Sequence, residues 1–203
     1  MPDMRNLKRQ KISRGLSSER IGEAALNMLD LHGPAALSAR RLAAALGCEA
    51  MSLYNHVGSM DEVQDLIVDQ ILSSLLLNEP KGDPLEEVRN EALRFLALAE
   101  AHPHAFALVA TRRWRTPGAL ALASRLVALL AATGLPARDA LRQARIHGAY
   151  LNGAGLGLAS WQLIPQSNND GSVSLAAEAS ALGASSVKAD LIAGLENILR
   201  SIG

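Results

Sequence analysis

The sequence predicts an all-α protein with an N-terminal domain of three helices and a larger helical C-terminal domain. Apolar residues recur at helical spacing along most of the 203 residues, and no segment shows the apolar–polar alternation of a strand. Gly and Pro interrupt this pattern at short intervals over residues 17–62, so the helices there must be short. We expect the larger domain to cover residues 63–203, and a chain of this length can bury a sizeable core.

Residues 1–16 are expected to form a basic, flexible arm. Their charged residues are one acid and five bases: Asp3, Arg5, Lys8, Arg9, Lys11 and Arg14. Such an arm could lie against phosphate groups, although a solvated terminus would have the same composition. The whole chain has a formal net charge of zero, which argues against a wholly basic nucleic-acid coat protein.

Three helices are predicted in the N-terminal domain, a longer one followed by two short ones. The first follows the serine pair 17–18, which offers N-caps, and ends at Gly33, which precedes a proline. Its apolar stripe consists of Ile21, Ala24, Ala25, Met28 and Leu29. The second helix is expected over about 38–46 and the third over about 49–57. Gly47 lies between them, where a residue without a Cβ makes a sharp turn easily.

Two longer helices follow. The fourth is expected to begin after Ser59, because Ser59 and Glu62 have the spacing of a capping box. Its core stripe consists of Val63, Leu66, Ile67, Ile71 and Leu75. A polar break at 78–84 ends it, and Asp83 with Glu86 predicts a second capping box at the start of the fifth helix. The core stripe of the fifth helix consists of Leu85, Val88, Ala92, Phe95, Leu96 and Ala99.

The rest of the chain also has helical periodicity. A short sixth helix is expected over about 103–111, a seventh over 117–134 and a long eighth over 136–161. The signal is weak over 174–182 and stronger over 188–202.

The second and third helices with their glycine turn have the plan of a helix–turn–helix. Apolar residues would fix the pair to its neighbours: Leu37, Leu42, Leu46, Leu53 and Val57. The residues left for an outward face that could enter the DNA major groove are Ser38, Arg40, Arg41, Ala50, Met51, Ser52, Tyr54, Asn55 and His56. The sequence therefore predicts DNA binding by this pair.

Residues 16–77 resemble the DNA-binding domain of the tetracycline-repressor (TetR/AcrR) family of transcriptional regulators. The matching pattern, in order, is Ile21-x-x-Ala24-Ala25, Gly33, Leu37-Ser38-x-Arg40-x-Leu42-Ala43, Leu46-Gly47 and Ser52-Leu53-Tyr54-x-His56-Val57. The resemblance implies a homodimeric repressor that leaves a palindromic operator when a small molecule binds. An activator is the less favoured alternative.

The resemblance also implies roles for single residues. Arg40 matches a position that contacts base or phosphate. The three residues 50–52 match the base-reading start of the third helix, and 54–56 match positions that touch the backbone and neighbouring bases. Arg can pair with guanine and Asn with adenine, although Tyr54 could pack half-buried and His56 could cap its helix. Met60 stands where many members carry a phosphate-binding Lys.

A weaker resemblance to the tetracycline-repressor type of C-terminal domain extends over residues 84–162, and it implies a ligand site. Aromatic residues make up 3% of the chain, and most of them fall in this range with histidines and an asparagine. The candidates for ligand binding, each of which could instead be a core or surface residue, are Phe95, His102, His104, Phe106, Trp114, His147, Tyr150, Asn152 and Trp161. Leu108 and Gly157 stand where that repressor has its magnesium-binding histidine and carboxylate. We therefore expect a mostly apolar effector other than magnesium–tetracycline.

Four glycines lie inside the predicted eighth helix: Gly148, Gly153, Gly155 and Gly157. Each costs about 1 kcal/mol of helix stability relative to Ala, so a close approach by another backbone or a ligand is expected. Packing in a homodimer through the eighth and last helices is the simplest reason, and a kinked helix is the alternative.

Several other classes of protein are not favoured. One cysteine, Cys48, excludes a disulfide within the chain and a cysteine metal cluster. The pair His102-x-His104 has no third metal ligand at helpful spacing, no nucleotide-binding or hydrolase motif occurs, and no cofactor or enzymatic activity is expected. Without a signal peptide or membrane span, we expect a cytoplasmic protein. The competing hypothesis is a helical small-molecule-binding or dimerisation protein whose DNA-binding domain has reduced function, which Met60 and the apolar pair 50–51 favour.

Overall fold

The structure, a computed structural model, describes residues 16–112, 114–163 and 184–202. All regular structure in this part of the chain is helical, as the sequence predicts. The helices are α2 (Ser18–His32), η1 (Pro34–Ala36), α3 (Ala39–Ala45), α4 (Ala50–Tyr54), α5 (Met60–Ser73), η2 (Ser74–Leu77), α6 (Pro84–Ala101), α7 (Pro103–Thr111), α8 (Pro117–Ala132), α9 (Ala137–Leu163) and α11 (Ala184–Arg200). The expected arm over residues 1–16 and the weak helix over 174–182 lie outside the described residues, apart from Leu16, which is buried.

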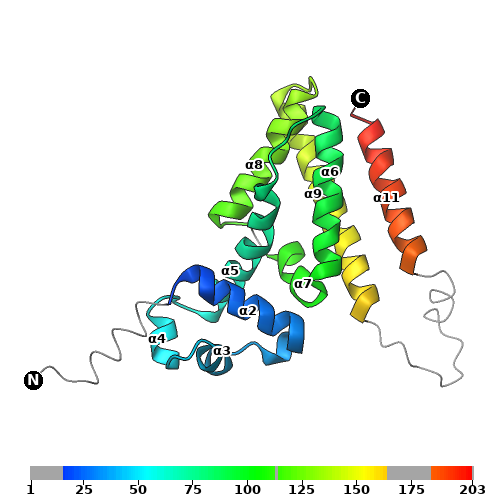
Figure 1. The fold of residues 1–203 in the computed structure, drawn as a ribbon. Helices are drawn as coiled ribbons and strands as arrows, with labels where there is room; N and C mark the ends of the chain where they lie inside the picture. Colours follow the sequence, from blue (N-terminus) through cyan, green and yellow to red (C-terminus); the bar gives the residue numbers. More distant parts are fainter. Residues whose placement is uncertain (1–15, 113, 164–183, 203) are drawn as a thin grey trace, which may run out of the picture.

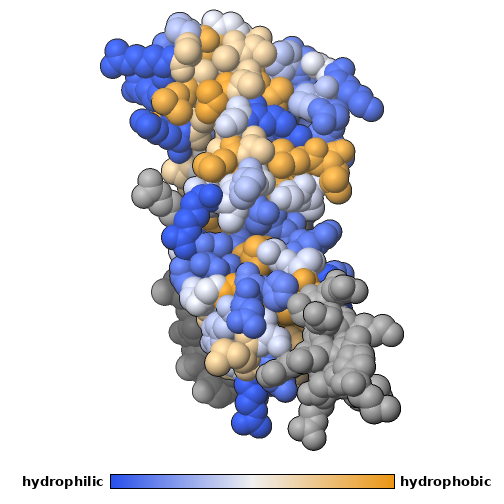
Figure 2. Space-filling view, turned by 90° about the vertical axis from the view of Figure 1, so that its left-hand side faces the viewer, coloured by the Kyte–Doolittle hydropathy of each residue, from blue (hydrophilic) through white to orange (hydrophobic). Residues whose placement is uncertain are grey.

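The helices form two groups joined by α5 (Figure 1). Helices α2, α3 and α4 make a small N-terminal group, which we call the head, and α6, α7, α8 and α9 make a larger group, which we call the body. Helix α5 packs against α2 at the head and against α7 and α8 in the body, and α11 packs along α6 and α9. Figure 2 looks onto the side formed by the head and α8, where apolar residues gather over the body.

Serine caps fix where the short helices of the head begin. The hydroxyl oxygens of Ser17 and Ser38 accept hydrogen bonds from backbone N–H groups three residues later, at 3.3 Å and 3.4 Å. Ser59 does the same for Glu62 at 3.2 Å, and the Glu62 carboxylate accepts a bond from the backbone N–H of Gly58 at 2.7 Å. The third helix was expected to reach residue 57 but ends at Tyr54, because the chain turns there to enter this capped start of α5.

The start of α6 differs in one detail from the expected capping box. Asp83 accepts hydrogen bonds from the backbone N–H groups of Leu85 and Glu86, as a cap should. The carboxylate that reaches back belongs to Glu87, which accepts a bond from the backbone N–H of Lys81 at 3.0 Å. The prediction that Glu86 closes the capping box is therefore wrong, because the backbone before the cap approaches Glu87 instead.

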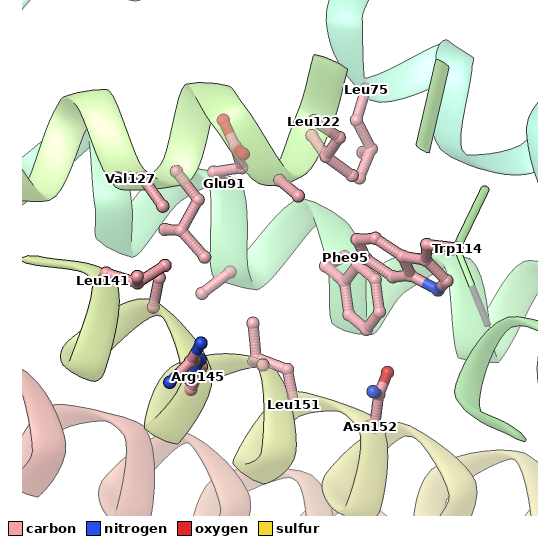
Figure 3. Close-up of a pocket in the computed structure, with 15 residues that line it drawn as sticks. Leu75, Glu91, Phe95, Trp114, Leu122, Val127, Leu141, Arg145, Leu151 and Asn152 are labelled. Carbon is pink, nitrogen blue, oxygen red and sulfur yellow. The ribbon is translucent and has the colours of Figure 1, made fainter. Parts of the chain in front are cut away.

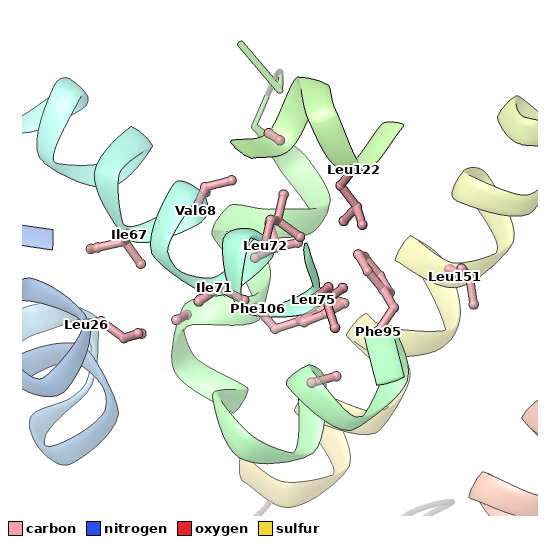
Figure 4. Packing of buried hydrophobic residues seen from close by; sticks show 14 of the residues in the cluster. Leu26, Ile67, Val68, Ile71, Leu72, Leu75, Phe95, Phe106, Leu122 and Leu151 are labelled. Atoms are coloured by element: carbon pink, nitrogen blue, oxygen red, sulfur yellow. The ribbon is translucent and has the colours of Figure 1, made fainter. Parts of the chain in front are cut away.

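The hydrophobic core is continuous from the head through α5 into the body (Figure 4). Ile67 and Ile71 on α5 are buried, and Leu26 on α2 lies on the head side of them. On the body side, the rings of Phe95 and Phe106 meet edge to face with their centroids 5.5 Å apart. This continuity makes α5 a structural part of both groups.

Packing within the chain, rather than in a dimer, explains one glycine of α9. A Cβ at Gly155 would overlap the ring of Phe106, which is fully buried. The dimer explanation is therefore not needed for Gly155. A Cβ at Gly148, Gly153 or Gly157 would meet nothing within 4 Å, so their surroundings in this chain do not require a glycine.

His147 is fully buried in α9, and neither of its ring nitrogens has a hydrogen-bond partner in the part of the chain that the structure describes. Burial lowers the pKa of His147 from its ordinary value of 6.5. The folded protein therefore keeps this imidazole neutral at a pH where the unfolded chain takes up a proton.

We predict that this histidine makes the protein less stable in mild acid. Its contribution is unchanged above the ordinary histidine pKa and turns unfavourable as the pH falls below it, by at most about 1.4 kcal/mol between pH 7.5 and 5.5. Urea unfolding at the two pH values measures this loss, and His147→Leu should reduce it. Equal losses in the variant and the wild type would contradict the prediction.

Candidate nucleic-acid interface and ligand cavity

The outward face of the head is held by apolar residues beneath it. Leu42 and Leu53 are fully buried and Val57 is 3% exposed, which fixes α3 and α4 onto the head. On the other side, Met51 is 72% exposed and Tyr54 42% exposed. Large apolar groups exposed on a five-residue helix are unfavourable in water, so this face suits contact with another molecule.

The nine candidates for DNA contact all lie on α3, on α4 or directly beside them. The residues that are exposed are Ser38, Arg40, Arg41, Met51, Tyr54, Asn55 and His56, with Ala50 and Ser52 partly buried. Ser38 caps α3, and the Arg41 guanidinium reaches the carbonyl oxygen of Ala35 at 3.5 Å. These two residues therefore also have a structural role. Met60 is partly buried and packs against the core.

A cavity of about 200 Å³ lies in the body between α6, α8 and α9 (Figure 3). Most of its wall is apolar, and the large apolar residues of the wall include Leu75, Phe95, Trp114, Leu122, Leu126 and Leu151. Three polar residues also line it: Glu91, Arg145 and Asn152. A concave apolar space with a few polar groups is what small-ligand sites have in common.

Glu91 is paired within the wall of the cavity. Its carboxylate accepts a hydrogen bond from Arg125 Nε at 2.8 Å, and Arg125 also donates to the backbone carbonyls of Leu75 and Asn78. Burial raises the pKa of Glu91, against the attraction of Arg125, which lowers it. The Glu91–Arg125 pair thus links the end of η2 to α6 and α8.

Three of the nine ligand candidates line the cavity: Phe95, Trp114 and Asn152. The other six lie elsewhere. Phe106 and His147 are in the core, and Trp161 is partly buried in the last turn of α9. Tyr150 Oη donates to the carbonyl oxygen of Leu191 in α11 at 2.5 Å.

The two remaining histidines lie where α7 meets the head. His102 Nδ1 is 2.7 Å from a carboxylate oxygen of Asp30 in α2, and a Cβ at Gly33 would lie 3.5 Å from the His104 ring. Sequence reasoning missed Glu91 and Arg145. The position of Arg145 two turns before Asn152 on one helix was the available signal.

An acidic stripe on α5 holds the chain between α7 and α8. Asp61, Asp65 and Asp69 are spaced four residues apart and so share one face of the helix. We call this stripe, with its partners Arg112, Arg115 and Gly118, the α5 clamp. Gln64 adds a further bond, accepting from Arg112 Nη1 at 2.7 Å.

Asp65 is the centre of the α5 clamp. It is largely buried and accepts from Arg112 Nε at 2.9 Å and from Arg115 Nε at 2.7 Å. Asp61 is exposed, and its hydrogen bonds with Arg112 and then Arg115 lower its pKa. At the other end, Asp69 accepts from the backbone N–H of Gly118 at 2.9 Å, where any side chain on Gly118 would collide with α5.

Trp114 belongs to the segment that the α5 clamp holds. It lies between Arg112 and Arg115 in sequence, its ring lines the cavity, and its Nε1 donates to the carbonyl oxygen of Val109 at 2.9 Å. The same short segment therefore touches the cavity with one side chain and α5 with two others. This contact therefore joins the cavity wall to α5.

Comparison with known proteins gives consistent relatives, although no family model matches the chain. An HTH-type transcriptional regulator of Saccharopolyspora erythraea is 34% identical over 143 residues, which are 68% of this chain and 59% of that protein. The HTH-type transcriptional repressor DrrR1 of Streptomyces coeruleorubidus is 30% identical over 141 residues, which are 68% of this chain and 52% of that protein. The chain thus spans little more than half the length of these curated relatives.

A solved structure covers nearly the whole chain. The crystal structure of the TetR family protein ActR from Streptomyces coelicolor, in complex with actinorhodin, is 26% identical with a TM-score of 0.74 and covers 92% of this chain and 95% of ActR. The fold and the head define a helix–turn–helix protein with a helical C-terminal domain. In its fold and in the helix–turn–helix of its head, this chain is similar to regulators of the TetR family, the family that its sequence pattern resembles.

No helix in the described ranges combines the length and the apolar character needed to cross a membrane.

We predict that Asp65→Ala destabilises the protein by about 2 kcal/mol or more, because the largely buried Arg112 loses its main carboxylate. Asp61→Ala is the matched control, since this carboxylate on the same face of α5 is 59% exposed and should matter less. Urea unfolding followed by circular dichroism measures both. A larger loss from Asp61→Ala than from Asp65→Ala would contradict the assignment of Asp65 as the centre.

Proposed function

We propose that this protein is a transcriptional repressor that binds a palindromic operator as a homodimer and is released from it by a small molecule. The observation that carries the proposal is the division of α3 and α4 into a buried leucine side and an exposed side of groove-compatible residues. Its relatives are regulators and a repressor by name. Such a protein acts in the cytoplasm, within reach of DNA.

The exposed face supplies the groups that DNA recognition needs. Arg40 can pair with guanine or phosphate and Asn55 with adenine, while Met51 can pack on a thymine methyl group. Tyr54 and His56 can donate to phosphate oxygens. Ser38, Arg41, Ala50 and Ser52 complete the proposed contact set. Each subunit would place α4 in one of two successive major grooves, about 34–36 Å apart.

The outer face of α9 supports a homodimer. Gly153 and Gly157 are exposed there and meet nothing within this chain, and Ile146 is 43% exposed on the same side. Small residues let a second backbone approach closely, which would offset the helix stability that the glycines cost. Helix α11 lies along α9 and would complete a four-helix contact with the partner.

The cavity and the α5 clamp together support control by a ligand. ActR has been crystallised with actinorhodin, and the corresponding body of this chain contains a cavity. A ligand that contacts Trp114 would act on the segment held to α5, and α5 begins directly after the DNA-reading helix. Such a ligand shifts the protein away from DNA only as far as its affinity for the DNA-releasing arrangement exceeds its affinity for the DNA-binding arrangement.

A second candidate is a ligand-binding dimer whose head binds DNA weakly or not at all. Met60 favours it, because an apolar, partly buried side chain cannot replace the phosphate contact that a lysine would make at this position.

In-vitro selection from random duplexes with the full chain separates the two candidates. The repressor enriches a palindrome, whereas the ligand-binding dimer enriches no sequence. We predict that Arg40→Ala and Asn55→Ala each weaken binding to the selected duplex by about 1–3 kcal/mol while the protein stays dimeric. Fluorescence anisotropy of labelled DNA measures the affinity, and size-exclusion chromatography measures the oligomeric state.

Arg138→Ala, on the exposed start of α9 in the body, is the charge-matched control and should bind like the wild type. Unchanged affinity in both head variants would refute the assignment of the reading face.

A further inference from the structure

Arg145 is an unused cation at the cavity. It lines the space, its side chain is exposed, and it makes no hydrogen bond or ion pair with the residues that the structure describes. The other arginine near the cavity, Arg125, is different, because Glu91 and two backbone carbonyls already satisfy it. Arg145 is thus free to bind an anion, and its planar guanidinium matches a carboxylate in two parallel hydrogen bonds.

Asn152 is a second unused polar group on the same wall. Its side-chain oxygen is buried and has no hydrogen-bond partner in the described ranges of the chain. A buried carbonyl oxygen left without a partner costs about 1–3 kcal/mol, so a ligand that donates a hydrogen bond there would remove a cost. In Figure 3 the amide extends from α9 toward the end of the cavity where Phe95 and Trp114 lie.

The spacing of these two groups sets the length of a ligand that reaches both. Seven residues separate them on α9, which is two helical turns or about 10.5 Å along the axis. Leu151 lies between them, and the rings of Phe95 and Trp114 line the end of the cavity near Asn152. The volume of about 200 Å³ is below the range of about 300–1,000 Å³ that is typical of drug-sized ligands.

We propose that the cavity binds a flat aromatic carboxylic acid of one or two fused rings, with a hydrogen-bond donor at the end opposite its carboxylate. The carboxylate pairs with Arg145 at the exposed end, the rings lie against Phe95 and Trp114, and the donor reaches Asn152. Glu91 does not repel such an acid strongly, because Arg125 compensates its charge. The inference rests on the proposed function only in taking the cavity as the effector site.

Isothermal titration calorimetry of the full chain with three probes tests the proposal without DNA. The probes are 6-hydroxy-2-naphthoic acid, 2-naphthoic acid, which lacks the donor, and 2-naphthol, which lacks the carboxylate. We expect the hydroxy acid to bind most tightly, about three- to ten-fold better than either of the others. Equal or tighter binding of 2-naphthol, or no binding of the hydroxy acid at millimolar concentration, would overturn the proposal.

Variants assign each end of the ligand. Arg145→Gln should weaken the two acids about three- to ten-fold and leave 2-naphthol unchanged. Arg142→Gln removes an exposed charge from the preceding turn of α9, outside the cavity lining, and should change none of the three affinities. Asn152→Leu keeps a similar side-chain volume and should remove the advantage of the hydroxyl group. Equal effects of the Arg142 and Arg145 variants would overturn the role of Arg145.

The ligand class and the repressor function can fail independently in these experiments. Selection of a palindromic operator together with failure of the naphthoic acids refutes this ligand class and leaves the repressor standing. Binding of the hydroxy acid with the expected pattern, but without any selected DNA, supports the ligand class and refutes the repressor.

Discussion

The packing of α5 into both the head and the body is the constraint on which the rest of the structure depends. Its apolar side is buried in one continuous core, and its acidic stripe holds the segment between α7 and α8. The head is joined to α5 chiefly through α2, and α4 is held to the head through α3. Since Trp114 lies in the segment that α5 holds, the cavity wall is bonded to the helix that follows the proposed DNA-reading helix.

The two proposed binding surfaces use opposite physical chemistry. The head presents exposed side chains on two short helices, fixed from below by leucines, and suits a large polar partner. The cavity is lined mostly by apolar side chains and suits a small amphipathic ligand, because Arg145 and the Asn152 side-chain oxygen have no hydrogen-bond partner among the described residues. Coupling between such sites needs differential affinity of each partner for two arrangements of α5.

Much of the fold could be predicted from local sequence signals. Ser17 and Ser59 cap helices where caps were expected, and Gly33 ends the first helix. The lining of the cavity is harder to predict from the sequence, because helical periodicity indicates which residues face inward but not which neighbours they contact. The ring of Phe106 occupies the space that a side chain at Gly155 would need, and Tyr150 bonds to α11. Arg145 has the pattern of a surface residue. The α5 clamp joins residues about fifty positions apart, and such pairing has no local signal.

The central claim is that the DNA-reading face and the cavity wall are coupled through α5, and operator-induced change in Trp114 emission tests it most directly. Trp161→Phe leaves Trp114 as the one tryptophan of the chain. Because coupling is reciprocal, addition of the selected operator should change the Trp114 emission, in parallel with the anisotropy of the labelled DNA. Emission that stays constant while the DNA becomes fully bound would contradict the account.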